Sequence, residues 1–451
     1  MIRSFFGFDE FRTDFKKEII GGATTFMTMS YIIFVQPVIL KGAGMDTGAV
    51  MFATCVSSAI ATLLMGLLAN YPIALAPAMG HNIFFAVIVC GAAGMGGKGY
   101  SWQIALGAVF ISGLIFTVLS ILGLWEVLVE AVPDSLKHSI AAGIGLLIAL
   151  IGLEYGGVVV DAPDVLVGLG DLSSAPVLLT FIGLIIISIL MTLRVPGAIL
   201  WGILVVAFLG IPMGIVEYKG IVSAPPSVSP TLFKLDIMGA LKTGLIPVIF
   251  VFFFLDLFDT MGTLIGVSDQ AGFLKNGKLP KASRAMFADA MGTVAGAFLG
   301  TSTVTSYIES STGISQGART GFANVITGLL FLLALFFSPL AEMIGGTYLY
   351  ETTIAGEPVT MKLHPVIAPA LIIVGYLIMK CVTRINWDDA TEAIPAFLVI
   401  IMMPLTLSIT EGIAFGFIAY SLLKLVSGRG REVHWMVYLF AGLFIIRYIF
   451  L

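Results

Sequence analysis

Between residues 300 and 313 the chain reads Gly300-Thr-Ser-Thr-Val-Thr-Ser-Tyr-Ile-Glu-Ser-Ser-Thr-Gly313. From Thr301 to Thr312 only Val304 and Ile308 are apolar, yet apolar runs at 283–299 and 320–344 flank this stretch. A segment this polar cannot face lipid, so it either lines an internal cavity or forms an outside loop. The cavity interpretation predicts a broken membrane span with Glu309 near its centre.

Composition places the rest of the chain in a lipid bilayer. Of its 451 residues, 58% are hydrophobic and 11% are charged, whereas soluble domains carry about 25% charged residues. Its apolar runs are continuous and close to the length of about 20 residues that crosses a hydrocarbon core. We therefore expect an all-α polytopic membrane protein. The sequence shows no basic patch with interleaved aromatic residues, which argues against a nucleic-acid partner.

The apolar runs predict about fourteen spans, and basic residues orient them. We expect the spans near 18–40, 48–68, 72–92, 102–123, 136–155, 176–194, 197–216, 241–268, 283–299, 301–317, 320–344, 364–381, 391–407 and 410–427. With residues 1–17 as a cytoplasmic N-terminus, sixteen basic residues, Lys275 and Lys278 among them, fall on the inner side and six on the outer side. This bias agrees with the positive-inside rule for a cell membrane protein. Omitting the span at 301–317 would destroy the alternation, which disfavours the loop interpretation.

The C-terminal stretch 435–451 is apolar but short and contains Arg447. It could lie along the membrane interface or form a fifteenth span. Because a charged side chain is costly in the middle of a bilayer, we expect an interfacial segment over 432–451 with a cytoplasmic end.

The third span also contains residues that do not suit a continuous helix. It reads Tyr71-Pro-Ile-Ala-Leu-Ala-Pro-Ala-Met-Gly-His-Asn-Ile-Phe-Phe-Ala86. Pro72 and Pro77 disfavour the helical conformation before them, so we expect an extended piece followed by a half-helix that starts near Pro77. The alternative is a Pro-kinked packing helix with Asn82 buried and hydrogen-bonded. His81 could be functional or could make a satisfied contact between helices.

Two carboxylates lie on one stripe of the eighth span. Phe252, Asp256, Asp259 and Thr263 follow helical spacing. Two close carboxylates in an apolar helix raise each other's proton affinity, so the stripe predicts a proton-binding site. Water entering at a helix break near Gly262 and Gly266 would favour Asp259 as the titrating member. The alternative is a structural hydrogen-bond network around that break.

Seven spans in each half would run in opposite directions, which is the inverted-repeat plan of many transporters. A carrier therefore fits better than a channel. An intramembrane hydrolase is disfavoured, because the four His residues show no His-Glu-x-x-His zinc spacing. We expect no enzyme activity, no metal and no cofactor. An anion transporter of the same architecture is a closer rival, although anions favour basic rather than acidic cavity residues.

At these residues the chain resembles a known family. Ala76–Phe85, Phe254–Gly266 and Gly300–Gly321 resemble the AzgA-like purine permeases of the xanthine/uracil and nucleobase–ascorbate transporter family, and the resemblance runs through nearly all of the chain. It implies a 7+7 inverted repeat with broken helices 3 and 10. The core domain would comprise 18–123 and 241–344, and the gate domain 136–216 and 364–427. It also implies proton-coupled uptake of adenine, guanine or hypoxanthine, often by a homodimer.

The resemblance implies a set of binding positions as well. They fall on Asn82, Asp256, Asp259 and Glu309, with Tyr307 beside them. We expect Asn82, Asp256, Glu309 and Tyr307 to bind substrate, and Asp259 with Asp256 to carry the coupled proton. The sequence departs from the family by flanking Asn82 with His81 and Ile83, where a small apolar pair is more usual. This departure leaves the preferred purine open. Separately, uracil or xanthine transport by the same architecture, and sodium as the coupling ion, are alternatives.

Overall fold

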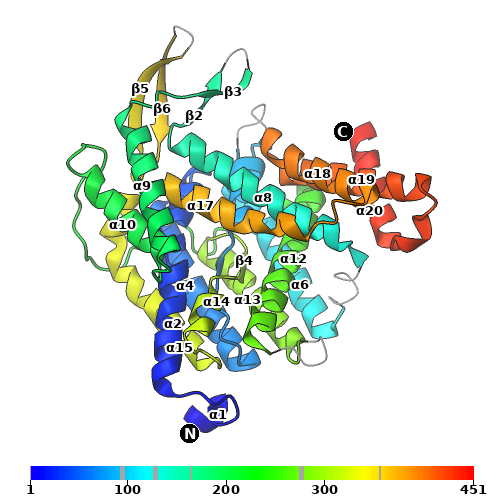
Figure 1. The fold of residues 1–451 in the computed structure, drawn as a ribbon, viewed down its shortest axis with the longest axis horizontal. Helices are drawn as coiled ribbons and strands as arrows, with labels where there is room; N and C mark the ends of the chain where they lie inside the picture. Colours follow the sequence, from blue (N-terminus) through cyan, green and yellow to red (C-terminus); the bar gives the residue numbers. More distant parts are fainter. Residues whose placement is uncertain are drawn as a thin grey trace.

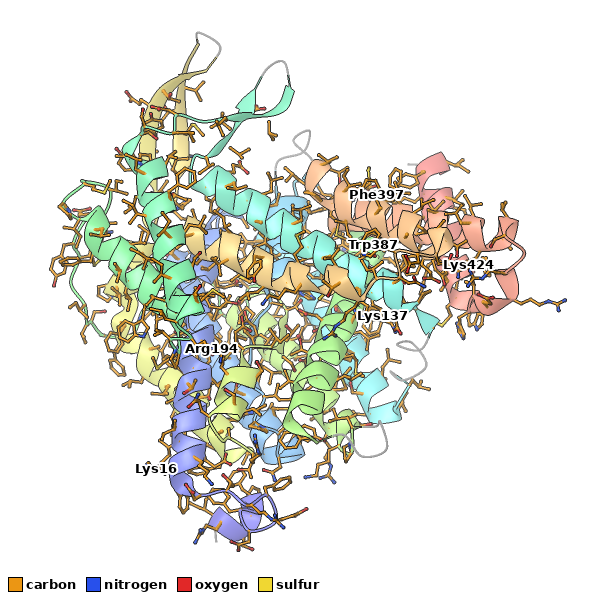
Figure 2. The ribbon with its side chains drawn as sticks, in the orientation of Figure 1. Lys16, Lys137, Arg194, Trp387, Phe397 and Lys424 are labelled. Carbon is orange, nitrogen blue, oxygen red and sulfur yellow. The ribbon has the colours of Figure 1, made fainter. Side chains whose placement is uncertain are left out.

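The computed structural model of the chain describes residues 2–91, 97–124, 131–162, 165–273, 279–354 and 357–450. Residue 92 at the end of the third expected span, the basic residues Lys275 and Lys278, and Leu451 lie outside these ranges. Helices dominate the described chain and surround a short central strand pairing, and side chains fill the space between them (Figures 1 and 2). Within the described residues eight helical segments are long and apolar enough to cross a membrane. The prediction of an all-α polytopic membrane protein is confirmed.

The helices of the first half follow the expected spans closely. The first span is divided at Ser30 and Tyr31, and Asp46 caps the second by accepting a hydrogen bond from the Ala49 N–H at 2.8 Å. The elements are α1 (Ile2–Phe6), α2 (Phe15–Met29), α3 (Ile32–Lys41), α4 (Thr47–Leu64) with the π-helical turn η1 (Met65–Ala69), α6 (Trp102–Leu122), α8 (Asp134–Tyr155), α9 (Ala175–Thr192) and α10 (Ala198–Gly210).

The helices of the second half are α11 (Ile237–Lys242), α12 (Ile246–Ala271), α13 (Ala282–Leu299), α15 (Phe322–Ala334), η3 (Leu335–Phe337), α16 (Ser338–Ile344), α17 (Ala368–Met379), η4 (Lys380–Arg384), α18 (Ala390–Leu405), α19 (Ile409–Val426), η5 (Gly430–Glu432) and α20 (Trp435–Phe450). The expected break near Gly262 and Gly266 is wrong, because α12 continues through both residues. Glycine alone does not break a membrane helix, whereas proline or an inserted group does.

The third and tenth spans are broken, as the sequence predicts. In the third span a strand, β1 (Leu75–Pro77), precedes the one-turn helix α5 (Met79–Ile83) and the π-helical η2 (Phe84–Val89). In the tenth, β4 (Val304–Ser306) precedes α14 (Ser310–Ser315). The two strands pair antiparallel, with Leu75 opposite Ser306 and Pro77 opposite Val304. Two further hairpins project from one end of the molecule in Figure 1, β2 (Val159–Ala162) with β3 (Val165–Leu169), and β5 (Tyr348–Ile354) with β6 (Glu357–Leu363).

The longer helices pack in two groups around this centre. In one group α13 packs against α4 and α6, and α15 packs against α2 and α4. In the other, α8 packs against α17 and α18, α9 packs against α10, and α18 packs against α19. The strand pair β1–β4 contacts α4 and α13 of the first group, whereas α5 contacts α3, α12 and, in the second group, α8.

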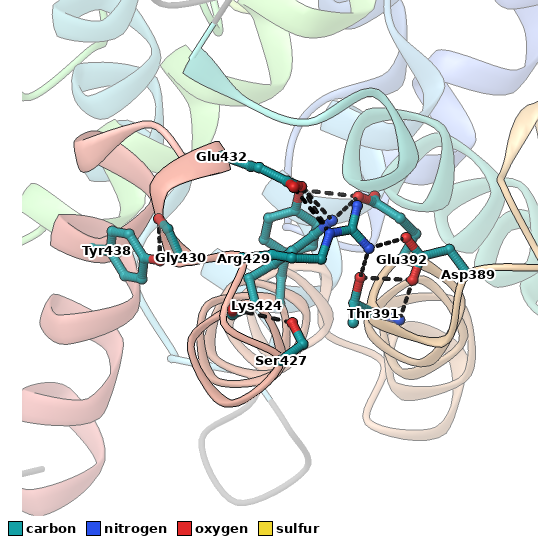
Figure 3. Close-up of polar contacts among 10 residues, drawn as sticks. Asp389, Thr391, Glu392, Lys424, Ser427, Arg429, Gly430, Glu432 and Tyr438 are labelled. Atoms are coloured by element: carbon teal, nitrogen blue, oxygen red, sulfur yellow. Dashed lines mark hydrogen bonds and ion pairs between the residues drawn. The ribbon is translucent and has the colours of Figure 1, made fainter.

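A polar cluster joins the last helices, and Figure 3 shows its contacts. Arg429 Nη1 lies 2.5 Å from Asp389 Oδ2, and Arg429 Nε lies 2.9 Å from Glu432 Oε2. The buried Lys424 Nζ lies 2.7 Å from Glu392 Oε1. The Arg429 hydrogen bond, aided by those from Thr391, holds the pKa of Asp389 well below its ordinary value. The cluster therefore ties the start of α18 to the end of α19.

The C-terminal helix α20 runs back along α19. Phe440 and Phe444 contact Phe417, and Arg447 forms an ion pair with Glu411 in the first turn of α19. The charge of Arg447 is therefore paired, which weakens the argument that it keeps this helix out of the bilayer. The interfacial placement of 432–451 stays a prediction.

We predict that Asp389→Asn lowers the melting temperature of the protein at pH 7, because Arg429 loses its charged partner. The lowered pKa of Asp389 means that its contribution is complete above about pH 4 and is lost as pH falls further. The difference between variant and native protein should therefore shrink in melts below about pH 4. Asp388→Asn, at a neighbouring exposed carboxylate, is the matched control. A difference that stays constant from pH 7 to pH 3 would contradict this assignment.

Candidate functional site

The candidate site is centred on the pairing of the two broken spans. Besides the β1–β4 ladder, the Ala78 N–H donates to Thr303 O at 3.0 Å and the Tyr307 N–H donates to Ala74 O at 2.9 Å. Tyr307 Oη also donates to the carbonyl oxygen of Pro77 at 2.5 Å. Prolines and polar residues prevent a continuous helix here, so each broken span supplies hydrogen-bond partners for the backbone of the other.

We call the pairing of β1 with β4 the crossing. Asn82 lies on α5, directly after β1 leaves the crossing, and is fully buried. Its Oδ1 accepts a hydrogen bond from Ser302, whose Oγ also accepts one from Gln36 Nε2 at 3.2 Å. Its Nδ2 contacts only the Met79 sulfur, at 4.0 Å, among the described residues. A thioether is a weak acceptor, so the amide donor is available to a ligand.

Glu309 lies at the start of α14, on the other side of the crossing. Its Oε1 accepts a hydrogen bond of 2.9 Å from Tyr31 Oη, which comes from the division between α2 and α3. The rings of Tyr31 and Tyr307 lie 6.5 Å apart. The Tyr307 hydroxyl is engaged with Pro77, so only its ring is free to contact a ligand. Asn82, Tyr307 and Glu309 are thus gathered at the two ends of one strand pairing.

The α12 stripe holds two carboxylates in different surroundings. Asp256 is fully buried, and its Oδ2 accepts from Thr293 Oγ1 at 3.2 Å. Asp259 is exposed, although it lies in the middle of α12, and its Oδ2 accepts from Thr305 Oγ1 at 3.3 Å. A carboxylate does not face lipid at this depth, so the exposure of Asp259 indicates a path for water.

Sequence reasoning missed Asp289, which lies on α13 and is fully buried. Its Oδ1 accepts from Thr260 Oγ1 at 2.8 Å and Ser306 Oγ at 3.2 Å, and its side chain contacts Asp256. Asp256 Oδ1 and Asp289 Oδ2 have no hydrogen-bond partner in the described part of the chain. A lone Asp in the apolar span 283–299 was the available signal, because ionisable residues inside membranes are usually functional.

The site carries acidic groups without compensating cations. Among the described residues, none of Asp256, Asp259, Asp289 and Glu309 forms an ion pair with Lys, Arg or His. The described chain also contains no cluster of three His, Cys, Asp or Glu residues that could hold a metal ion. The arrangement can accept hydrogen bonds from a polar ligand and can hold protons.

The chain is similar to known permeases along its whole length. The permease family model Xan_ur_permease matches residues 16–349. The adenine permease AdeP of Escherichia coli is 44% identical over 100% of this chain and 96% of its own length. The guanine/hypoxanthine permease PbuG of Bacillus subtilis is 45% identical over 100% of both proteins. Among solved structures, the transmembrane domain of the cyanobacterial bicarbonate transporter BicA matches with a TM-score of 0.62 and 14% identity over 88% of this chain and 97% of that domain. That likeness shows the fold, a 7+7 arrangement of spans.

We predict that Tyr307→Phe destabilises the crossing of the broken spans. It leaves the Pro77 carbonyl without the phenol donor, which should cost about 1–3 kcal/mol and lower the melting temperature of the purified protein. Tyr218→Phe, at an exposed tyrosine, serves as the control. Equal melting temperatures for Tyr307→Phe and the native protein would show that this hydrogen bond does not hold the crossing together.

Proposed function

The chain belongs to the xanthine/uracil permease family, and we propose its function from that membership. It is a multi-pass membrane transport protein, and we infer that it imports the purine nucleobases adenine, guanine and hypoxanthine across the cell membrane. The observation that carries this proposal is full-length similarity of more than 40% identity to permeases named for these bases. The N-terminus is cytoplasmic in this proposal, as the distribution of basic residues predicts.

The chemistry of the crossing supports a neutral, polar heterocycle as substrate. Glu309 Oε1 is engaged by Tyr31, which leaves Oε2 to accept from an N–H of the base. Asn82 offers its amide donor from the opposite side of the crossing. Purine edges carry both donors and acceptors, so the two side chains can be satisfied by one ligand. In this proposal Asp256 and Tyr307 complete the substrate site.

An anion is the second candidate, because related folds transport anions. The matched structures include a bicarbonate transporter and the anion transporter Slc26a9. In this chain the crossing is surrounded by the carboxylates of Asp256, Asp259, Asp289 and Glu309, which would repel an anionic substrate. The side chains therefore favour a neutral base over an anion.

We propose proton symport with alternating access as the mechanism. Burying an uncompensated carboxylate costs several kcal/mol, and a neutral base cannot cancel its charge. A proton can, so the site must be protonated before the core domain (18–123 and 241–344) moves against the gate domain (136–216 and 364–427). Asp259 is open to water and can exchange protons with the solution. Asp256 and Asp289 interact with each other and can hold one proton between them.

Glu309→Gln tests the substrate assignment. The amide keeps the size of the side chain but replaces one acceptor with a donor, so we predict that purine binding weakens about tenfold or more. Equilibrium binding of a tritiated purine to the purified variant measures this, with protein yield as a check on folding. Glu342→Gln, at a surface ion pair, should bind normally. Unchanged affinity in Glu309→Gln would refute the contact.

The coupling assignment is tested by separating exchange from accumulation in proteoliposomes. Asp259→Asn imitates the protonated form permanently, so it should retain purine counterflow but lose accumulation driven by a pH gradient. Asp256→Asn and Asp289→Asn should reduce pH-driven accumulation more than counterflow, because either change removes the shared proton. Asp134→Asn, at a surface ion pair, should leave both activities unchanged. If all three site variants still concentrate purine in response to a pH gradient, these carboxylates do not carry the proton and Glu309 becomes the leading candidate.

A further inference from the structure

His81 is a buried imidazole with no partner. Its exposed fraction is 2%, and neither ring nitrogen forms a hydrogen bond within the described chain. By contrast, the other buried histidine, His364, has its Nδ1 3.2 Å from Gly346 O. Buried polar atoms in native proteins are nearly always hydrogen-bonded, so two unpaired nitrogens on one side chain indicate a missing partner.

The two unpaired ring nitrogens of His81 lie next to the candidate substrate site. His81 directly precedes Asn82 on α5. Phe84 and Phe85, three and four residues later, contact Phe252 on α12 with ring centroids 4.9 and 6.4 Å apart. Residues three and four apart share one helix face, so His81 lies on the side of the third span that meets α12.

Helix α5, which carries His81, also contacts α12, the helix that carries Asp256. Asp256 is the start of the carboxylate group described above, and Asn82 is the adjacent amide.

We propose that His81 hydrogen-bonds the transported base and lets the site accept both amino- and oxo-purines. This inference rests on the proposed function. Ionised carboxylates can only accept hydrogen bonds, whereas a neutral imidazole offers one donor and one acceptor whose positions exchange with its tautomer. Adenine presents an amino donor at the position where guanine and hypoxanthine present an oxygen acceptor. His81 can therefore match either pattern.

Two substitutions separate recognition from packing. His81→Phe keeps a planar ring but removes both nitrogens, and His81→Gln keeps one donor and one acceptor. We would measure competition by adenine and by hypoxanthine against a tritiated purine bound to the purified full-length protein. We expect His81→Phe to weaken the binding of both bases by about tenfold or more, with His81→Gln retaining binding of both bases. The melting temperature of ligand-free His81→Phe should not fall, because the substitution removes two unpaired polar atoms.

Ser421→Ala is the matched control, since Ser421 is also buried without a hydrogen-bond partner but lies on α19. It should leave both affinities unchanged. Unchanged affinities for adenine and hypoxanthine in His81→Phe would overturn the inference and leave the proposed function standing. If His81→Phe does not fold, His81→Met, which also lacks both nitrogens, takes its place, and a loss of affinity of less than about twofold there overturns the inference. Native protein that binds no purine would instead refute the proposed function.

Discussion

The antiparallel pairing of β1 with β4 is the interaction on which the rest of the structure depends. A bilayer offers no water to the backbone, so a helix that stops inside it leaves N–H and C=O groups that must find partners. Here two spans stop at the same place and satisfy each other, from Ala74 to Ala78 on one side and from Thr303 to Tyr307 on the other. Neither broken span would be stable in lipid without its counterpart.

This crossing also explains how polar side chains come to lie together. Each strand leads directly into a short helix, so Asn82 and Glu309 are held close to the crossing by the same backbone bonds that satisfy the strands. Helices α12 and α13 pack beside β4 and supply Asp256, Asp259 and Asp289. Four carboxyl groups without a described cation make protonation the simplest way to keep the site at low charge. Binding and proton coupling would then share one set of contacts.

Much of this arrangement was predictable from sequence, because it depends on local rules. Pro72 and Pro77, and the polar run from Thr301 to Thr312, cannot form lipid-facing helix, and both spans are broken as predicted. The pairing itself was not predictable from local pattern, since Tyr307 and Pro77 lie 230 residues apart. Asp289 was missed because the glycines around it suggested only close packing. The break predicted at Gly262 and Gly266 was wrong, because glycine without proline does not interrupt α12.

The central claim is that the crossed broken spans form the substrate site. A cryo-electron microscopy map of the protein with adenine or hypoxanthine bound tests it most directly. The account predicts density for the base between α5 and α14, within hydrogen-bond distance of Asn82 and Glu309. Density for the base at a site away from both broken spans would contradict it.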